Sequence, residues 1–242
     1  MPSIAAYHRP DSLDEALSLL AAPNRRALGG GTIVVPESRV SRPEPVELVD
    51  LQGLALDGWE QTDESLTIGA MVRLGGLAER ADAPPLLADL ARRELPSALR
   101  NQASVGGTVA LGDPDSLFLA GLLVHRTQVH LHGQDSIDLT QSLAECVGQR
   151  IVTGVSLDPT GVGAIAVTGR TPADTPIVAA IARAVDGDVR LALTGVGVYP
   201  VLADPADPTA GLEPPSDFRG SADYRLHLVE TLSTRAVQEV SS

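Results

Sequence analysis

Two glycine-containing segments constrain this chain more than any other feature of its sequence. In the downstream segment, Gly106 and Gly107 follow a polar stretch and precede an aspartate-rich turn and the apolar run 116–124. Adjacent residues without a Cβ allow backbone conformations closed to other residues, so successive N–H groups can turn toward one anionic ligand. A similar segment, residues 29–32, lies upstream after a short apolar stretch. A phosphate cradle and a simple turn both remain open at this point, because most glycine pairs are only turns.

The basic residues of the chain are all arginine. Lysine and arginine together number 18 among 242 residues, none of them is a lysine, and the formal net charge is −13. The lack of lysine excludes a phosphate-loop lysine, a Schiff-base lysine and a Ser–Lys nucleophile. Nucleic-acid surfaces need clustered positive charge, so the negative net charge argues against a nucleic-acid partner.

Cysteine and aromatic content narrow the cofactor classes further. The single cysteine, Cys146, excludes an internal disulfide framework and a four-cysteine iron–sulfur or zinc site, and we interpret it as a core residue. Aromatic residues make up 2% of the chain, so aliphatic side chains or a partner must pack any flat cofactor. No apolar run is long enough to span a membrane, and the N-terminus lacks a secretory pattern, so we expect a cytoplasmic protein with no membrane span.

Hydrophobic periodicity and turn signals predict a succession of helices and strands. The expected helices cover residues 12–22, 75–81, 84–95, 116–124 and 221–240, and the expected strands cover residues 24–28, 46–51, 66–74, 128–131, 150–157, 163–168 and 188–201. Ser12 and Glu15 form a capping-box pattern at the start of the first helix. Residues 158–161 mark the expected domain boundary, and residues 200–215 are expected to be loosely ordered.

Two clusters of polar residues admit both a functional and a structural interpretation. His125, His130 and His132 lie close together in the sequence, and two of them share one face of a predicted strand. We interpret them as solvated strand histidines, because the residues around them do not provide a metal-ligand pattern. Asp113 and Asp115 belong to one turn before the helix 116–124, where a capping role and a contact to a cofactor are equally compatible with the pattern.

Several stretches, in the same order, resemble the flavin-binding medium subunit of the molybdenum hydroxylases, the family of carbon monoxide dehydrogenase and xanthine dehydrogenase. Residues 28–36, LGGGTIVVP, are similar to the family's Ala-Gly-Gly-Thr loop, and residues 99–116, LRNQASVGGTVALGDPDS, to its Arg-Asn-x-Ala-Thr-Ile-Gly-Gly-Asn loop. Residues 66–79 resemble the strand and helix after the first subdomain. Residues 170–179 and 214–236 resemble the C-terminal domain of the same subunits. The resemblance thus covers almost the whole chain.

The resemblance implies an α+β fold class. The expected architecture is a PCMH-type FAD-binding fold of two α/β subdomains, followed by a C-terminal domain of antiparallel sheet plus helices. The FAD-binding domain is expected at residues 1–158, with subdomains at about 1–55 and 56–158. A domain like the C-terminal domain of the carbon monoxide dehydrogenase flavoprotein is expected at residues 159–242.

The resemblance also implies a binding site for FAD between the first two subdomains. In relatives both glycine loops hold the FAD diphosphate. Because this chain lacks lysine, backbone N–H dipoles, aided by arginine, must neutralise that group. The cofactor-binding residues that the resemblance implies are Gly29, Gly30, Gly31, Thr32, Ile33, Ser104, Val105, Gly106, Gly107, Thr108, Asp113 and Ile151. Neither a catalytic side chain nor a metal ligand is expected in the chain.

The resemblance implies the function of an electron-transfer subunit. A molybdopterin-binding large subunit oxidises the substrate, the clusters of a 2Fe-2S small subunit carry the electrons, and FAD in this chain passes them to an external acceptor. The single cysteine agrees with this division, since the clusters must then lie in another chain. The flavin carries the redox chemistry, and the protein supplies binding and orientation.

Two alternatives to this function remain. Ile33 stands where relatives usually have a polar residue, Thr108 where they usually have asparagine, and Ala166 where they often have a lysine near the flavin. These substitutions suggest a degenerate structural subunit that kept the fold and lost the flavin. The other alternative is a free-standing flavoprotein reductase.

Overall fold

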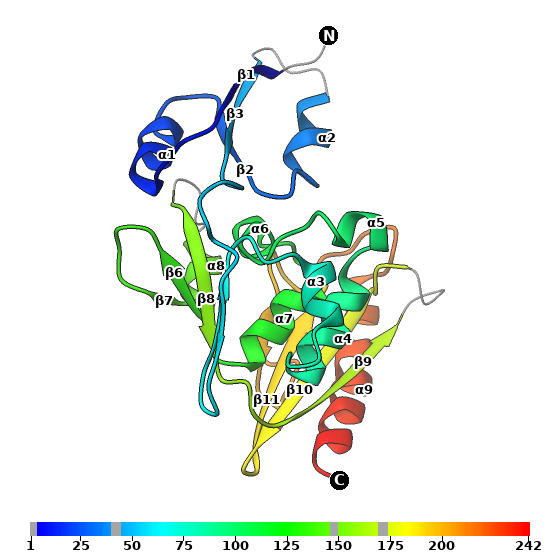
Figure 1. Cartoon of the computed structure of the whole chain (residues 1–242). Helices are drawn as coiled ribbons and strands as arrows, with labels where there is room; N and C mark the ends of the chain where they lie inside the picture. Colours follow the sequence, from blue (N-terminus) through cyan, green and yellow to red (C-terminus); the bar gives the residue numbers. More distant parts are fainter. Residues whose placement is uncertain (1–3, 40–44, 146–149, 169–173) are drawn as a thin grey trace.

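The computed structural model describes residues 4–39, 45–145, 150–168 and 174–242, which form three β-sheets with helices packed on them (Figure 1). Cys146 lies outside these ranges, so its predicted place in the core is not part of this description. Within the described ranges, none of the helices combines the length and the apolar character needed to cross a bilayer.

The N-terminal lobe is a small parallel sheet flanked by two helices, at the top of Figure 1. Its elements are β1 (Ile4–His8), α1 (Leu13–Leu20), β2 (Arg25–Leu28), α2 (Val34–Arg39) and β3 (Val46–Asp50), with strand order β1-β3-β2. Ser12 caps α1, because its Oγ accepts from the Glu15 N–H at 3.1 Å. The Glu15 carboxylate accepts from the Asp11 N–H at 2.8 Å. In a standard capping box it would accept from the N–H of the N-cap itself, Ser12, so the predicted box forms with the preceding residue as its donor. Residues 29–32, the first glycine loop, connect β2 to α2.

The central layer is an antiparallel sheet covered by six helices, counted over the described residues. Its strands are β4 (Trp59–Gln61), β5 (Leu66–Gly69), β6 (Gln128–Leu131), β7 (Ile137–Asp138) and β8 (Val152–Leu157), in the order β4-β5-β8-β6-β7. Its helices are α3 (Leu74–Glu79), α4 (Pro85–Glu94), α5 (Ser97–Arg100), α6 (Val105–Leu111), α7 (Leu117–Val124) and α8 (Leu139–Ala144). Residues 104–108, the second glycine loop, enter α6.

The C-terminal layer is a second antiparallel sheet with one long helix on it. Its elements are β9 (Val162–Thr168), β10 (Val178–Val185), β11 (Asp188–Thr194), β12 (Val201–Ala203) and α9 (Ala222–Val240), with strand order β12-β11-β10-β9. Helix α9 packs on β9 and β10. It buries Leu228, Leu232 and Ala236 and leaves Tyr224 exposed.

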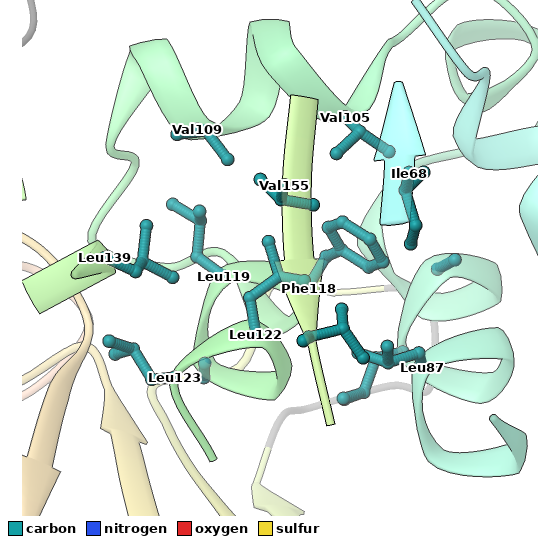
Figure 2. Close-up of a cluster of buried hydrophobic side chains, with 14 of the residues drawn as sticks. Ile68, Leu87, Val105, Val109, Phe118, Leu119, Leu122, Leu123, Leu139 and Val155 are labelled. Carbon is teal, nitrogen blue, oxygen red and sulfur yellow. The ribbon is translucent and has the colours of Figure 1, made fainter. Parts of the chain in front are cut away.

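Helix α7 is the centre of the molecule, because all eight of its residues are buried. It packs against α4 on one side and against β10 and β11 of the C-terminal layer on another. Figure 2 shows Phe118, Leu119 and Leu122 among apolar side chains from α4, α6 and the central sheet. Burying a leucine or phenylalanine side chain contributes about 1.5–3 kcal/mol, so this helix ties two layers together. Gly121 permits the close approach of α4, since a Cβ there would lie 2.4 Å from Leu90 Cδ1.

Three segments differ from the elements predicted for them. The strand expected over residues 66–74 ends at Gly69, because the carbonyls of Ala70 and Val72 accept from the second glycine loop. The strand expected over residues 188–201 divides into β11 and β12, because Gly195 adopts φ +74° and its N–H donates to Pro114 O at 3.0 Å. Residues 200–215 are ordered by β12 and by Asp204, whose carboxylate accepts from the Ala206 N–H.

A buried arginine fastens α9 to the C-terminal sheet. Arg225 is fully buried, and its Nη1 donates to Ile177 O at 2.8 Å and to Gly195 O at 2.7 Å. Its Nη2 lies 2.8 and 2.9 Å from the two carboxylate oxygens of Asp217. These hydrogen bonds hold the pKa of Asp217 below its usual range.

We predict that Asp217→Ala lowers the free energy of unfolding by clearly more than an exposed control substitution does, because it leaves the fully buried guanidinium of Arg225 without its counter-charge. Denaturant unfolding followed by circular dichroism measures this change. The matched control is Glu230→Ala on the exposed side of α9, which should change the stability by less than about 0.5 kcal/mol. Equal effects of the two substitutions would contradict the assigned role of Asp217.

Candidate functional site

A cavity of about 650 Å³ lies between the N-terminal lobe and the central layer. Its walls come from β2, the first glycine loop and the start of α2 on one side, and from α6 and the residues before β8 on the other. The apolar part of the lining is aliphatic and includes Leu51, Leu56, Met71 and Val152. The cavity is large enough for a dinucleotide-sized ligand, since ligand pockets typically measure about 300–1,000 Å³.

Eleven of the twelve residues predicted from the sequence line this one cavity. They are Gly29, Gly30, Gly31, Thr32, Ile33, Ser104, Gly106, Gly107, Thr108, Asp113 and Ile151. The exception is Val105, whose side chain is fully buried in the core and whose N–H donates to Val72 O at 3.0 Å. Segments separated by some 70 residues of sequence therefore meet at a single site.

The two glycine loops are in direct contact. A Cβ on Gly30 would lie 1.9 Å from the carbonyl oxygen of Gln102, and a Cβ on Gly29 would lie 3.2 Å from Ser104 Oγ. The guanidinium of Arg73 donates to the same Gln102 carbonyl and lies 3.0 Å from the position of the Gly30 Cβ. Because the loops touch, one ligand can contact both of them.

The first glycine loop presents backbone donors to the cavity. In the described part of the chain, the N–H groups of residues 29–32 donate to no protein acceptor. Gly31 has φ +73°, a conformation that side chains rarely allow, and it turns the chain into α2. Gln52 holds the loop in place, since its Nε2 donates to Gly29 O at 3.1 Å and its N–H to Asp50 Oδ1 at 3.0 Å. Residues 29–32 line the cavity, and unpaired backbone N–H groups in a cavity wall are suited to bind an anion.

The second glycine loop differs from the cradle that the sequence suggested. The N–H groups of residues 105–108 are bonded within the protein. Gly106 donates to Ala70 O at 2.8 Å, Gly107 to Ser104 Oγ at 3.2 Å and Thr108 to Ser104 O at 2.9 Å, and the Val105 N–H donates to Val72 O. Gly106 is needed for packing, since a Cβ there would lie 2.5 Å from Ala70 Cβ. This loop therefore forms a wall of the cavity as the first turn of α6. The N–H groups of Gly106, Gly107 and Thr108 are not free to bind a ligand.

Arginine supplies the positive charge around the cavity. Three arginines in the lining are paired with glutamates: Arg25 with Glu47 at 2.7 Å, Arg26 with Glu37 at 3.2 Å and Arg150 with Glu145 at 3.1 Å. Arg73, next to both glycine loops, has no carboxylate partner among the described residues. Its charge is thus available to complement an anion held at the loops.

Glu94 is a cavity residue that the sequence analysis missed. One carboxylate oxygen accepts from Ser116 Oγ at 2.5 Å and the other from the Phe118 N–H at 2.8 Å. Burial raises the pKa of Glu94 to about 7, against these hydrogen bonds, and the nearby charge of Asp113 acts in the same direction as burial. A glutamate in the last turn of a helix is ordinary in a sequence, so no local signal marks this one.

Asp113 lies in the cavity wall and shapes the turn before α7, but it is not the N-cap of that helix. It lines the cavity, and its Oδ1 accepts from the Asp115 N–H at 2.9 Å to form the turn. The N-cap of α7 is Ser116, whose Oγ accepts from the Leu119 N–H at 3.1 Å. Asp115 instead pairs with Arg219 of the C-terminal layer at 2.8 Å.

The histidines do not form one group. His125 is 2% exposed at the end of α7, so its interpretation as a solvated strand residue is wrong. Its Nδ1 lies 2.7 Å from Asp158 O, and burial, together with the charge of Arg183, lowers its pKa to about 4. His130 contacts Ser156 Oγ at 2.8 Å, and His132 contacts Asp14 at 2.7 Å. Over the described ranges, no three His, Cys, Asp or Glu side chains gather as a metal site.

We predict that Gly30→Ala destabilises the fold by about 2 kcal/mol, because the new Cβ must push the first glycine loop away from Gln102. Thermal and denaturant unfolding of the purified chain measure the loss. Gly53→Ala is the matched control, since a Cβ on Gly53 would have no atom within 4 Å. A Gly30→Ala variant as stable as the control would show that the loops do not touch in solution.

Comparisons with known proteins agree with this geometry. Residues 3–156 match the family described as FAD binding domain in molybdopterin dehydrogenase. The chain is 26% identical over 246 residues to YgfM of Escherichia coli K12, described as an uncharacterized protein, covering 95% of this chain and 93% of that protein. It is 36% identical over 108 residues to the aldehyde oxidoreductase FAD-binding subunit PaoB of Escherichia coli K12, covering 43% of this chain and 34% of that subunit.

The fold is also similar to a solved structure. The match is to a chain in the crystal structure of the Cu,Mo-CO dehydrogenase in its cyanide-inactivated form, with a TM-score of 0.87 and 23% identity over 99% of this chain and 98% of that chain. This likeness confirms the predicted fold class. The family match covers more than half of the chain and includes both glycine loops. The chain therefore belongs to the family of FAD-binding domains in molybdopterin dehydrogenases, as the resemblance of its sequence implied.

Proposed function

We propose that this chain binds FAD in the cavity between its two glycine loops and serves as the electron-transfer subunit of a molybdenum hydroxylase-type complex. One observation carries the proposal. Both glycine segments of an FAD-binding family domain, far apart in sequence, border a single cavity of about 650 Å³. One ligand can contact both segments because they touch, and the volume of the cavity leaves room for a dinucleotide.

The residues present fit an FAD diphosphate at the first glycine loop. The N–H groups of residues 29–32 have no protein acceptor among the described residues, so they are free to donate hydrogen bonds to an anion. The guanidinium of Arg73 adds positive charge beside Gly30. We assign Ser104, Thr108 and Asp113 as polar groups of the site from their places in its wall.

The aliphatic lining fits the flat ring systems of FAD. Ile33, Ile151 and their apolar neighbours surround the cavity, and no tryptophan, tyrosine or phenylalanine of the described residues lines it. Bound FAD supplies one- and two-electron chemistry. The part of the chain is to hold the cofactor, to exclude water from its ring and to fix its distance from an electron donor.

The cysteine content of the chain indicates which subunit of the proposed complex carries the iron–sulfur clusters. The chain has one cysteine, so 2Fe-2S clusters that reduce the flavin belong to a partner subunit. A molybdopterin-binding large subunit completes the proposed assembly, which agrees with the description of the family model. We propose that residues 1–158 form the FAD-binding domain of this subunit and residues 159–242 its C-terminal domain.

Two observations favour the alternative of a structural subunit without flavin. The second glycine loop uses its N–H groups inside the protein, and Ala166 is buried in the C-terminal core and does not line the cavity. The two functions differ in one measurable property, the flavin content of the purified complex.

We predict that the chain, purified with its partner subunits or incubated with FAD and freed of excess ligand, shows the visible absorption of bound oxidised flavin in stoichiometric amount. Ile33→Trp should reduce the flavin content severalfold without a loss of thermal stability, because Ile33 is half-exposed on the cavity wall. Val198→Trp, on an exposed side chain outside the cavity, is the matched control and should keep its flavin. A colourless complex that FAD does not reconstitute would reject the electron-transfer function.

A further inference from the structure

Glu94 lies in the wall of the cavity but is fixed by groups outside it. It ends α4, and its two carboxylate oxygens bind Ser116 Oγ and the Phe118 N–H at the start of the buried helix α7. The side chain therefore has little freedom to turn toward bulk water. A ligand that fills the cavity will cover it further.

In the described part of the chain, the charge of Glu94 has no arginine partner. The nearby arginines are engaged elsewhere: Arg92 donates to Ala78 O, Arg93 pairs with Asp89 at 3.0 Å, and Arg100 donates to Arg92 O at 2.5 Å and Leu95 O at 3.2 Å. The turn opposite brings two more carboxylates, Asp113 and Asp115, of which Asp115 is paired with Arg219. Among the described residues, no arginine forms an ion pair with Glu94. Asp113 is therefore the charge that faces it, and it repels.

Two effects disfavour the ionised form of Glu94, namely its burial and its repulsion by Asp113. An anionic ligand in the cavity strengthens both of them. Burial already raises the pKa of Glu94 to about 7, so a fraction of the molecules carries the proton near neutral pH. Ligand binding removes water from the cavity, and the diphosphate adds negative charge to it. By linkage, if a ligand raises the pKa of a group on the protein, that group takes up protons when the ligand binds.

We propose that Glu94 must bind a proton for FAD to be held tightly, so that FAD binding to this chain is coupled to proton uptake at the cavity wall. This inference rests on the proposed binding of FAD. The affinity is then constant at acidic pH, where Glu94 is already protonated. It falls as the pH rises through neutrality, by up to about tenfold for each pH unit.

The test compares FAD binding at about pH 6 and about pH 8.5, a range that brackets the raised pKa. Titrations follow the quenching of flavin fluorescence by the purified full chain, and calorimetry in buffers of different ionisation enthalpy counts the protons taken up. The wild-type chain should lose about tenfold or more in affinity over this range and take up a fraction of a proton at pH 7.5.

Glu94→Gln is the decisive variant, because a neutral amide matches both contacts of the protonated carboxyl. Its Nε2 can donate to Ser116 Oγ, and its Oε1 can accept from the Phe118 N–H. This variant should show a flat pH profile and no proton uptake. Glu60→Gln, on an exposed strand residue far from the lining, is the matched control and should keep the wild-type slope.

The outcomes separate this inference from the function on which it rests. If wild-type chain binds FAD with no proton uptake, or if Glu94→Gln keeps the wild-type pH slope, the inference is overturned while FAD binding stands. If the wild-type chain binds no FAD at either pH, the proposed function itself is rejected. The proton count on the wild-type chain needs no variant, so a folding defect in Glu94→Gln does not remove the test.

Discussion

The site depends on one contact, the approach of Gly30 to the carbonyl of Gln102. A Cβ at this position would lie 1.9 Å from that oxygen, so the two loops can touch only if residue 30 has no side chain. The contact joins the N-terminal lobe to the central layer at the cavity, since one loop belongs to the lobe and the other enters α6. Arg73 reinforces it by donating to the same carbonyl. The lobe and the central layer thus form one binding site because of backbone packing, and the side chains around the contact decide what the site can hold.

The two glycine loops play different roles in the structure, whereas their sequences suggest two equivalent halves of one phosphate cradle. The second loop uses its N–H groups to begin α6 and to bind Ala70 and Val72, so its glycines serve the fold. The first loop keeps its N–H groups free among the described residues, and Gln52 and Asp50 hold it in this conformation. Free N–H groups remain hydrated until a ligand replaces the water. The second loop therefore forms part of the cavity wall, and the N–H groups of the first loop are the ones available to an anion.

The first cap follows from a local pattern of the sequence, since Ser12 and Glu15 predict it. The fold class and the site residues came instead from the resemblance to a family, and eleven of the twelve residues that the resemblance implied line one cavity. The structure differs from the prediction where a distant segment decides the local structure. The chain leaves the strand after Gly69 because the carbonyls of Ala70 and Val72 accept from the second loop, and Gly195 leaves the sheet because its N–H donates to Pro114 O. The sequence predicts a solvated His125, whereas the packing around the end of α7 buries it.

Glu94 shows how the core imposes chemistry on the site. The uniformly apolar helix α7 can exist only in the interior, and its first N–H groups then need acceptors there. Ser116 supplies one, and the Glu94 carboxylate supplies another at Phe118. The positive end of a helix favours an ionised acid, whereas burial beside Asp113 favours a neutral one. Burial dominates, since the pKa rises to about 7. A requirement of helix packing therefore places a proton-binding group in the wall of the cavity, and any anion that enters must interact with its charge.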